Sequence, residues 1–409
     1  MDWNIYLRLS TLMFMEFAIW GAWMPVLAIR LLGPLKMTGK QTGWIYAMFP
    51  LACIFAPWAS GYMADKWFNA EQIILASHAL GAILLFIAAK QTKFWGMLSV
   101  MFLYSVCYTA TLPLVNKLLF AQLPSEATWI FLWAPVAWAL IGYVLTGFRQ
   151  IRKIGGDGPD SLYLAAFLSA IMVVVCMFQI PLRPAATSNP MVEALGMLTN
   201  TNYLIFILAQ LAVSGMMQFY FLGTGQFMQD RGISGRNISA AMGSAQAVQA
   251  IATITLLGVL LKYAGFQWTF VIGALCWSTL FLTYVMSKRA LPILLVQAFH
   301  GLAYVFFMIG GQIFVGDMAP KEIGASAQSL IFIATNGVGL FVGTQLAGFF
   351  MEKNRVEGKF QWSKIWMVPL GITLAGAVVF AVLFKVPDAS EFKKDVPAQE
   401  KAVAVAENL

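Results

Sequence analysis

The side chains that could do chemistry in this 409-residue chain are few, because its long apolar segments contain almost no ionisable residues. Glu16 is the exception, since it lies inside the apolar stretch from Met13 to Trp23. If that stretch crosses a membrane, a charge at its centre costs about 2.5 kcal/mol or more unless a partner, water or a proton compensates it. Glu16 therefore has two interpretations. It accepts a hydrogen bond from a substrate or carries a proton, or it is a protonated structural carboxyl that ties its helix to a neighbour.

Uncharged amides form a second group of candidates. Gln246 and Gln249 are three residues apart and share a helix face, and Gln218 lies in the preceding apolar segment. Amides both donate and accept hydrogen bonds, which suits a hydroxylated or heterocyclic ligand. The alternative is hydrogen bonding between helices, worth about 0.6 kcal/mol on average in membranes. We expect these three amides to face a cavity, and we include Asn116 as a weaker candidate.

The chain has two histidines, and no spacing of His, Cys, Asp or Glu typical of a metal site. We interpret His78 as a packing residue and His300 as a substrate contact. A flat ligand could also stack on aromatic rings near the amides. The candidates are Trp20, Tyr143, Phe221 and Tyr304. We find no nucleophile with a base and no phosphate-binding glycine loop, so we expect no enzyme activity, no cofactor and no metal.

The elements that position these residues follow from composition. The chain is 60% apolar and 11% charged, whereas a soluble domain is about 25% charged. This indicates an all-α integral membrane protein, because helices satisfy their own backbone hydrogen bonds in lipid. The pI near 9.3 does not indicate nucleic acid binding, since the basic residues lie singly at helix ends, where they can meet lipid headgroups.

Apolar runs of bilayer length, about 20 residues, recur along the chain and predict twelve transmembrane helices. The expected spans are 6–31, 42–63, 71–89, 95–119, 129–148, 162–180, 202–228, 238–263, 269–286, 291–315, 325–350 and 362–384. They divide into an N-terminal six-helix bundle at 1–182 and a C-terminal one at 201–386. A linker with proline at 183–200 joins the bundles, and we expect the charged tail at 387–409 to be disordered.

A short charged segment, Gly61 to Trp67, separates the second and third spans. Gly61, Asp65 and Lys66 resemble the loop signature G-x-x-x-D-K of the major facilitator superfamily. We expect Asp65 and Lys66 at a water interface, where Gly61 lets two helix ends approach, so these residues are candidates for a gating loop. The resemblance implies two six-helix bundles with a solute bound between them.

Other motifs are similar to those of the bacterial nucleoside:proton symporter family. They are W-G-x-W at 20–23, A-D-K-W at 64–67, A-S-A-Q at 325–328 and T-N-G-x-G at 335–339. The resemblance implies that Gln218, Gln246 and Gln249 contact the solute. Gln249 and Val305 stand where the family has carboxylates, so proton coupling has either moved to Glu16, with help from His300, or been lost.

These observations predict a secondary active transporter that moves a nucleoside or a related small polar solute by alternating access, with a proton. The alternative is a uniporter or symporter for a sugar or another hydroxylated metabolite, and a membrane sensor is disfavoured because no soluble domain is present. We expect a monomer in the lipid bilayer of the bacterial cytoplasmic (inner) membrane, without a nucleic acid partner. The loop signature favours cytoplasmic termini, whereas the more basic loops lie on the opposite side.

Overall fold

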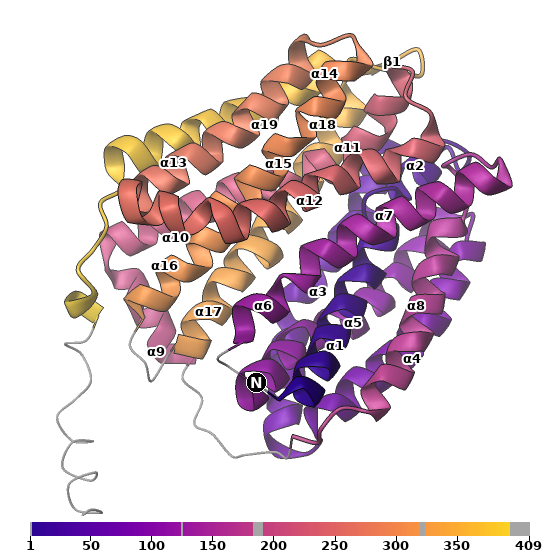
Figure 1. Cartoon of the computed structure of the whole chain (residues 1–409). Helices are drawn as coiled ribbons and strands as arrows, with labels where there is room; N and C mark the ends of the chain where they lie inside the picture. The colour runs from indigo at the N-terminus through magenta and orange to yellow at the C-terminus, as the bar shows by residue number, and fades with distance from the viewer. Residues whose placement is uncertain (1, 124–125, 183–190, 320–323, 393–409) are drawn as a thin grey trace, which may run out of the picture.

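The computed structural model describes residues 2–123, 126–182, 191–319 and 324–392, and these are helical apart from short connections and one small hairpin (Figure 1). The first half contains α1 (Trp3–Trp23), α2 (Leu27–Leu32), α3 (Gly39–Lys66), α4 (Ala70–Lys90), α5 (Phe94–Gln122), α6 (Ala127–Phe131), α7 (Trp133–Arg152) and α8 (Asp160–Met177).

The second half contains more interrupted helices. They are α9 (Met191–Gly196), α10 (Thr201–Gly215), α11 (Met217–Asp230), α12 (Ile238–Thr255), α13 (Leu257–Met286), α14 (Ala290–Leu295), α15 (Gln297–Ala303), α16 (Gly310–Met318), α17 (Gly324–Phe332), α18 (Leu340–Lys353) and α19 (Trp362–Val378). Three π-helical turns, η4 (Tyr304–Ile309), η6 (Ile333–Gly339) and η7 (Val379–Leu383), continue α15, α17 and α19. The antiparallel hairpin of β1 (Arg355–Val356) and β2 (Lys359–Phe360) joins α18 to α19.

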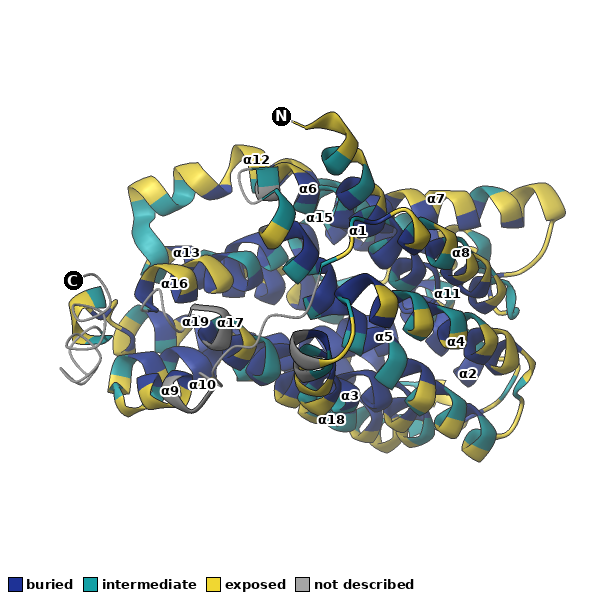
Figure 2. Cartoon of the chain, turned by 90° about the horizontal axis from the view of Figure 1, so that it is seen from below, coloured by how far each residue is buried: buried dark blue, intermediate teal, exposed yellow. Residues whose placement is uncertain are grey.

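Within the described residues, eleven segments are long and apolar enough to cross a membrane. α12 is not among them, because its amides and small residues lower its apolar character. α13 contains Gly265 with φ 68° and ψ 179°, a conformation that glycine adopts readily. The chain turns there (Figure 2), so residues 257–264 extend α12 and residues 266–286 form the next span. Counting α12 with its extension gives the twelve helices that the sequence predicts.

The helices assemble into two bundles, as predicted. In Figure 1 the indigo-to-magenta helices α1 to α8 lie beside the pink-to-yellow helices α10 to α19. In the first bundle α4 packs against α5 and α8, and in the second α13 packs against α15 and α19. Large apolar side chains such as Ile83 and Phe167 are exposed on the outside, where a bilayer would cover them.

Close approach of small residues brings the bundles together along two seams. At the seam between α7 and α12, a Cβ atom on Gly142 would lie 2.6 Å from the carbonyl oxygen of Ser239. At the seam between α3 and α18, a Cβ atom on Gly43 would lie 3.1 Å from the Cα of Gly348. A side chain at either glycine would force the bundles apart, so these positions determine how closely the bundles pack.

Polar contacts between the bundles gather at the end away from the chain termini. Arg149 Nη1 donates to Ser239 Oγ at 3.0 Å, and the backbone N–H of Gly39 donates to Glu352 Oε2 at 2.9 Å. Arg149 Nε also pairs with Asp160 Oδ2 at 2.5 Å. The first two contacts join the bundles at one end of the molecule, and the third fixes the Arg149 side chain within the first bundle.

The predicted gating loop has a different local structure from the one expected. α3 continues through Gly61 to Lys66, and a Cβ atom added at Gly61 would meet none of the described residues within 4 Å. Within the described residues, no second helix end therefore approaches Gly61. The side chains of Asp65 and Lys66 lie outside the described residues.

The predicted linker and tail are partly structured. Residues 183–190 and 393–409 lie outside the described part of the chain, but α9 and a 3₁₀ turn at Met197–Thr199 occupy most of the rest of the linker. In the tail, Glu391 accepts a hydrogen bond from Asn200 Nδ2 at 2.7 Å, and the rings of Phe392 and Tyr203 are 5.5 Å apart. Helical packing thus continues to Phe392, beyond the predicted start of disorder at residue 387.

Candidate functional site: a cavity between the bundles

A cavity lies between the two bundles, and both contribute side chains to it. Its lining comprises Phe17, Trp20 and Met24 of α1; Ala134, Pro135 and Trp138 of α7; Met217 and Phe221 of α11; Gln246 and Gln249 of α12; His300 of α15; Tyr304 of η4; Asn336 of η6; and Leu340 of α18. The first bundle supplies only apolar and aromatic residues, whereas the second supplies every amide and the imidazole. A ligand that is flat on one side and rich in hydrogen-bonding groups on the other would fit this division.

The polar wall presents atoms that find no hydrogen-bond partner among the described residues. They include Gln249 Oε1, an acceptor, and His300 Nε2. Both side chains are buried, at 6% and 0% exposure. A buried polar atom without a partner costs about 1–3 kcal/mol, so such atoms in a cavity indicate a place where a ligand or water completes the hydrogen bonding.

The imidazole of His300 is held in one orientation. Trp277 Nε1 donates to His300 Nδ1 at 3.2 Å, and the ring of His300 stacks on Tyr220 with centroids 3.9 Å apart. Tyr220 in turn donates its hydroxyl proton to Gln297 Oε1 at 2.9 Å. An indole N–H can only donate, so Nδ1 is the acceptor and a neutral His300 carries its proton on Nε2. The cavity therefore receives a donor from His300 and an acceptor from Gln249.

The aromatic wall centres on Trp20. Its ring stacks on Phe49 with centroids 4.6 Å apart and meets Trp138 edge to face at 5.0 Å. Phe221 approaches Trp138 from the second bundle at 6.2 Å. Aromatic rings hold a flat partner at such separations, so this wall can receive a heterocyclic ring.

Two π-helical turns bring residues of the second bundle to the cavity. Tyr304 begins the turn at 304–309, and Asn336 lies within the turn at 333–339. Asn336 Nδ2 donates to Thr335 Oγ1 at 3.0 Å, which fixes its amide. π-helical turns inside α-helices are frequent at functional sites. Asn336, which stands out in the sequence only as part of the T-N-G-x-G motif, thus lines the cavity.

The structure separates the predicted substrate residues into two groups. Trp20, Phe221, Gln246, Gln249, His300 and Tyr304 line the cavity.

The other three do not line it. Tyr143 is 47% exposed on the outer surface, because its neighbour Gly142 occupies the seam with α12. Asn116 is half-buried on α5. Gln218 is fully buried on α11, one turn before Phe221, and neither atom of its amide finds a partner among the described residues.

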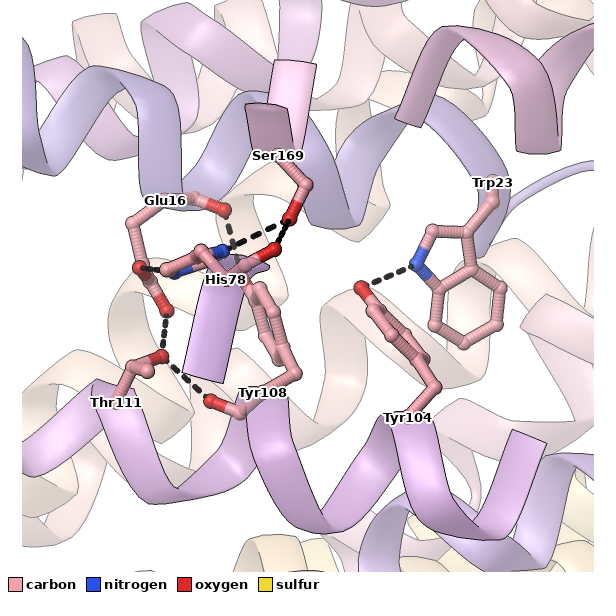
Figure 3. A network of polar contacts seen from close by, with 7 residues as sticks. All are labelled: Glu16, Trp23, His78, Tyr104, Tyr108, Thr111 and Ser169. Carbon is pink, nitrogen blue, oxygen red and sulfur yellow. Dashed lines mark hydrogen bonds and ion pairs between the residues drawn. The ribbon is translucent and has the colours of Figure 1, made fainter. Parts of the chain in front are cut away.

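Glu16 does not line the cavity either. Its side chain, which extends from α1, is fully buried. Figure 3 shows it beside His78 of α4 and Thr111 of α5, with Ser169 of α8 next to His78. Oε2 lies 3.0 Å from His78 Nε2, and Oε1 lies 2.5 Å from Thr111 Oγ1. The expectation that Glu16 lines a wet passage is therefore wrong, whereas His78 is a buried, hydrogen-bonded residue, as interpreted from the sequence.

The partnership of Glu16 and His78 was missed because the residues lie 62 positions apart. One signal could have suggested it, since His78 lies in an apolar segment of the same half of the chain. Trp277 and Tyr220, which orient His300, carried no such signal because Trp and Tyr are common in membrane helices.

Comparisons with known proteins agree with this architecture. Residues 3–389 match the family described as "Nucleoside H+ symporter". The chain is similar to the nucleoside permease NupG of Escherichia coli, with 27% identity, 93% of this chain covered and 96% of that protein. It is also similar to the xanthosine permease of the same organism, with 25% identity over the same shares of the two chains.

Solved structures show the same fold. A crystal structure of a NupG variant superposes with a TM-score of 0.84 at 25% identity, covering 93% of this chain and all of that one. A POT family transporter with 5-aminolevulinic acid has a TM-score of 0.75 at 11% identity, covering 95% and 96% of the two chains. The protein is thus a multi-pass membrane transporter of the major facilitator fold, and its relatives are transporters rather than enzymes. The match over nearly the whole chain shows that it belongs to the nucleoside H+ symporter family.

Proposed function

We propose that this transporter carries a nucleoside together with a proton, and that the nucleoside binds in the cavity between the bundles. The observation that carries the proposal is the division of the lining, with aromatic rings on one wall and amides and an imidazole on the other. A nucleoside has the matching division into a flat base and a hydroxylated sugar. NupG and the xanthosine permease, by their names, carry such solutes.

In the proposed complex the base stacks against Trp20 and Trp138, with Phe221 and Tyr304 beside it. Gln249 Oε1 accepts and His300 Nε2 donates, and the accessible amide of Gln246 does either. Gln218 is fully buried on α11, one helical turn before Phe221, and its amide, which has no partner among the described residues, becomes available if α11 rotates during transport. We do not assign Tyr143 or Asn116 to this site.

The two bundles, with boundaries near residues 182 and 201, act as the units that rock about the cavity. The contacts at the end away from the termini support a state that is closed on that side. We infer cytoplasmic termini and the cytoplasmic membrane from the loop signature, although the loops opposite the termini hold more basic residues. One chain supplies the whole cavity lining, which supports a monomer.

The proposal is tested by measuring the binding of nucleosides and related compounds to the purified protein. Uridine, adenosine, xanthosine, their free bases, ribose and glucose are titrated in a thermal-shift assay, followed by calorimetry. Nucleosides should stabilise the protein more than free bases or sugars, because only they engage both walls. Stabilisation by sugars alone would instead favour a sugar transporter of the same fold, and no stabilisation by any nucleoside contradicts the proposed substrate.

A further inference from the structure

Glu16 and His78 form a buried ionisable pair that the solute cavity does not use. Glu16 Oε2 and His78 Nε2 are 3.0 Å apart, and the two side chains are 0% and 2% exposed. We propose that this pair is the proton-binding site of the transporter, which rests on the proposed proton-coupled function. It binds one proton while buried and releases it when the pair opens to water on the other side.

The hydroxyls around the pair can follow the gain or loss of a proton. Thr111 Oγ1 lies 2.5 Å from Glu16 Oε1 and 2.6 Å from the backbone oxygen of Tyr108. A hydroxyl has one proton to donate. With a proton on Oε1, Glu16 donates to Thr111, which donates to Tyr108. Without it, Thr111 turns and donates to the carboxylate.

The imidazole has an equivalent neighbour on its other side. Ser169 Oγ lies 3.1 Å from His78 Nδ1 and also 3.1 Å from the backbone oxygen of His78. When Nδ1 carries a proton, it donates to Ser169, which donates to the backbone oxygen. When Nδ1 is bare, Ser169 turns and donates to the ring. Each hydroxyl therefore has a partner in both protonation states, and no heavy atom needs to move.

Burial determines which protonation state the pair of Glu16 and His78 adopts. With one shared proton the pair has no net charge, either as carboxylate and imidazolium or as carboxyl and imidazole. Removing that proton leaves one net negative charge in an apolar interior, which is strongly unfavourable. The buried pair therefore holds its proton until a change in bundle packing admits water.

Among the described residues, no charged side chain other than His78 forms an ion pair with Glu16. The other ionisable groups that interact with Glu16 are Tyr104 and Tyr108 of α5 and Cys176 of α8, and Cys53 and Cys107 lie near these tyrosines; all are uncharged near neutral pH. α6 has no ionisable residue.

Charged groups on the other packed elements lie at helix ends. α7 carries its cations, Arg149 and Arg152, in its last turn. Glu71 lies in the first turn of α4, where it accepts a hydrogen bond from the backbone N–H of Leu182 at 3.2 Å.

Aromatic packing connects the pair to the solute cavity. Trp20, one helical turn after Glu16, lines the cavity, and its ring lies 6.1 Å from that of Tyr108. Tyr108 donates its hydroxyl proton to the backbone oxygen of Glu16 at 2.7 Å, and its ring lies 6.0 Å from that of His78. A solute that displaces Trp20 thus acts on the side chain that holds Glu16 in place.

The test uses the full-length protein in liposomes with a pH gradient and a pH-sensitive dye inside. Wild type, Glu16→Gln and His78→Gln are compared for gradient-driven uptake of labelled uridine and for uridine exchange without a gradient. Glu16→Gln should lose accumulation and the accompanying proton flux while exchange continues, and His78→Gln should change the pH at which uptake is half-maximal. Glu71→Gln, which removes another buried acid of the same bundle, should accumulate uridine like wild type.

Accumulation by Glu16→Gln at the wild-type level, with its proton flux intact, would overturn the proposal. If a variant unfolds, Thr111→Val replaces it, and the expected result is again a shifted pH profile. An infrared pH-difference spectrum tests the proton site independently of the proposed substrate, because the measurement needs no solute. A titrating carboxyl or imidazolium band that is present in wild type and missing in Glu16→Gln or His78→Gln supports the site even if uridine proves not to be carried, and the absence of both bands from wild type contradicts it.

Discussion

At the scale of single residues, solute recognition depends on two oriented polar atoms in the cavity. Gln249 Oε1 has no partner among the described residues, and His300 Nε2 is equally unpartnered while its other nitrogen accepts from Trp277. The sequence resemblance implies that the family has a carboxylate at the position of Gln249, where this chain has an amide. An amide accepts through one atom and donates through the other, so the site keeps its acceptor without a charge.

Gln249→Leu should weaken nucleoside binding. The substitution removes the acceptor and leaves a polar group of the ligand without a partner, a loss of about 1–3 kcal/mol. We expect Kd to rise roughly tenfold or more, measured by calorimetry. Gln312→Leu is the matched control, because Gln312 of α16 is exposed and does not line the cavity. An unchanged Kd for Gln249→Leu contradicts its role.

Trp277→Phe should weaken binding without touching the ligand. The change keeps an aromatic ring beside His300 but removes the donor that fixes Nδ1 as an acceptor. The imidazole can then present either tautomer, so part of the population offers the cavity no donor. We expect a severalfold rise in Kd with little change in thermal stability. A Kd equal to that of wild type would show that the indole does not orient His300.

At the scale of helices, the seams between bundles are built from glycines and one buried arginine. Gly142 lies against the backbone of α12. A Cβ atom added at Gly147, on the same helix, would meet none of the described residues within 4 Å. The two glycines therefore differ in whether a side chain can be tolerated.

Gly142→Val should force α7 and α12 apart, and Gly147→Val should not. A Cβ at Gly142 would lie 2.6 Å from a backbone oxygen of Ser239, and such overpacking costs about 1–3 kcal/mol. Spin labels at Ile151→Cys and Asn237→Cys report the separation of the seam by electron paramagnetic resonance. A longer mean distance is expected for Gly142→Val alone, with a slower transport rate. Equal distances in both variants would rule out this seam as a determinant of closure.

Arg149→Gln should destabilise the closed end. Arg149 is fully buried, pairs with Asp160 and donates to Ser239 across the seam. Removing one partner of a buried pair costs about 3–5 kcal/mol, so the thermal unfolding midpoint should fall clearly. Arg152→Gln, an exposed cation on the same helix, serves as the control and should unfold like wild type. A midpoint unaffected by Arg149→Gln would show that the pair is dispensable.

At the scale of the whole molecule, the sequence predicted the fold better than the site. Apolar runs of bilayer length define each span locally, so the helices and their grouping in two bundles could be predicted from the sequence. The same local logic found Gln246 and Gln249 on one face. Sequence spacing could not predict that the Tyr143 side chain faces the outer surface, because its direction depends on how closely Gly142 approaches α12.

Contacts between distant spans escaped prediction for the same reason. His78 reaches Glu16 only because α5 and α8 each pack against both α4 and α1, and no spacing in the sequence records that packing. The π-helical turn that carries Asn336 likewise depends on its neighbours, since Asn336 follows an ordinary helical pattern in the sequence. Tertiary packing thus determined which polar residues face the solute and which face each other.

The central claim is that one chain moves a nucleoside through the cavity between its bundles, driven by protons. The most direct measurement is uptake of labelled nucleosides by wild-type protein in liposomes, with the interior more alkaline than the exterior. We predict saturable accumulation above the external concentration, abolished by a protonophore and weakened by Gln249→Leu. Saturable uptake that stops at the external concentration whatever the gradient, or no uptake of any nucleoside, would contradict the account.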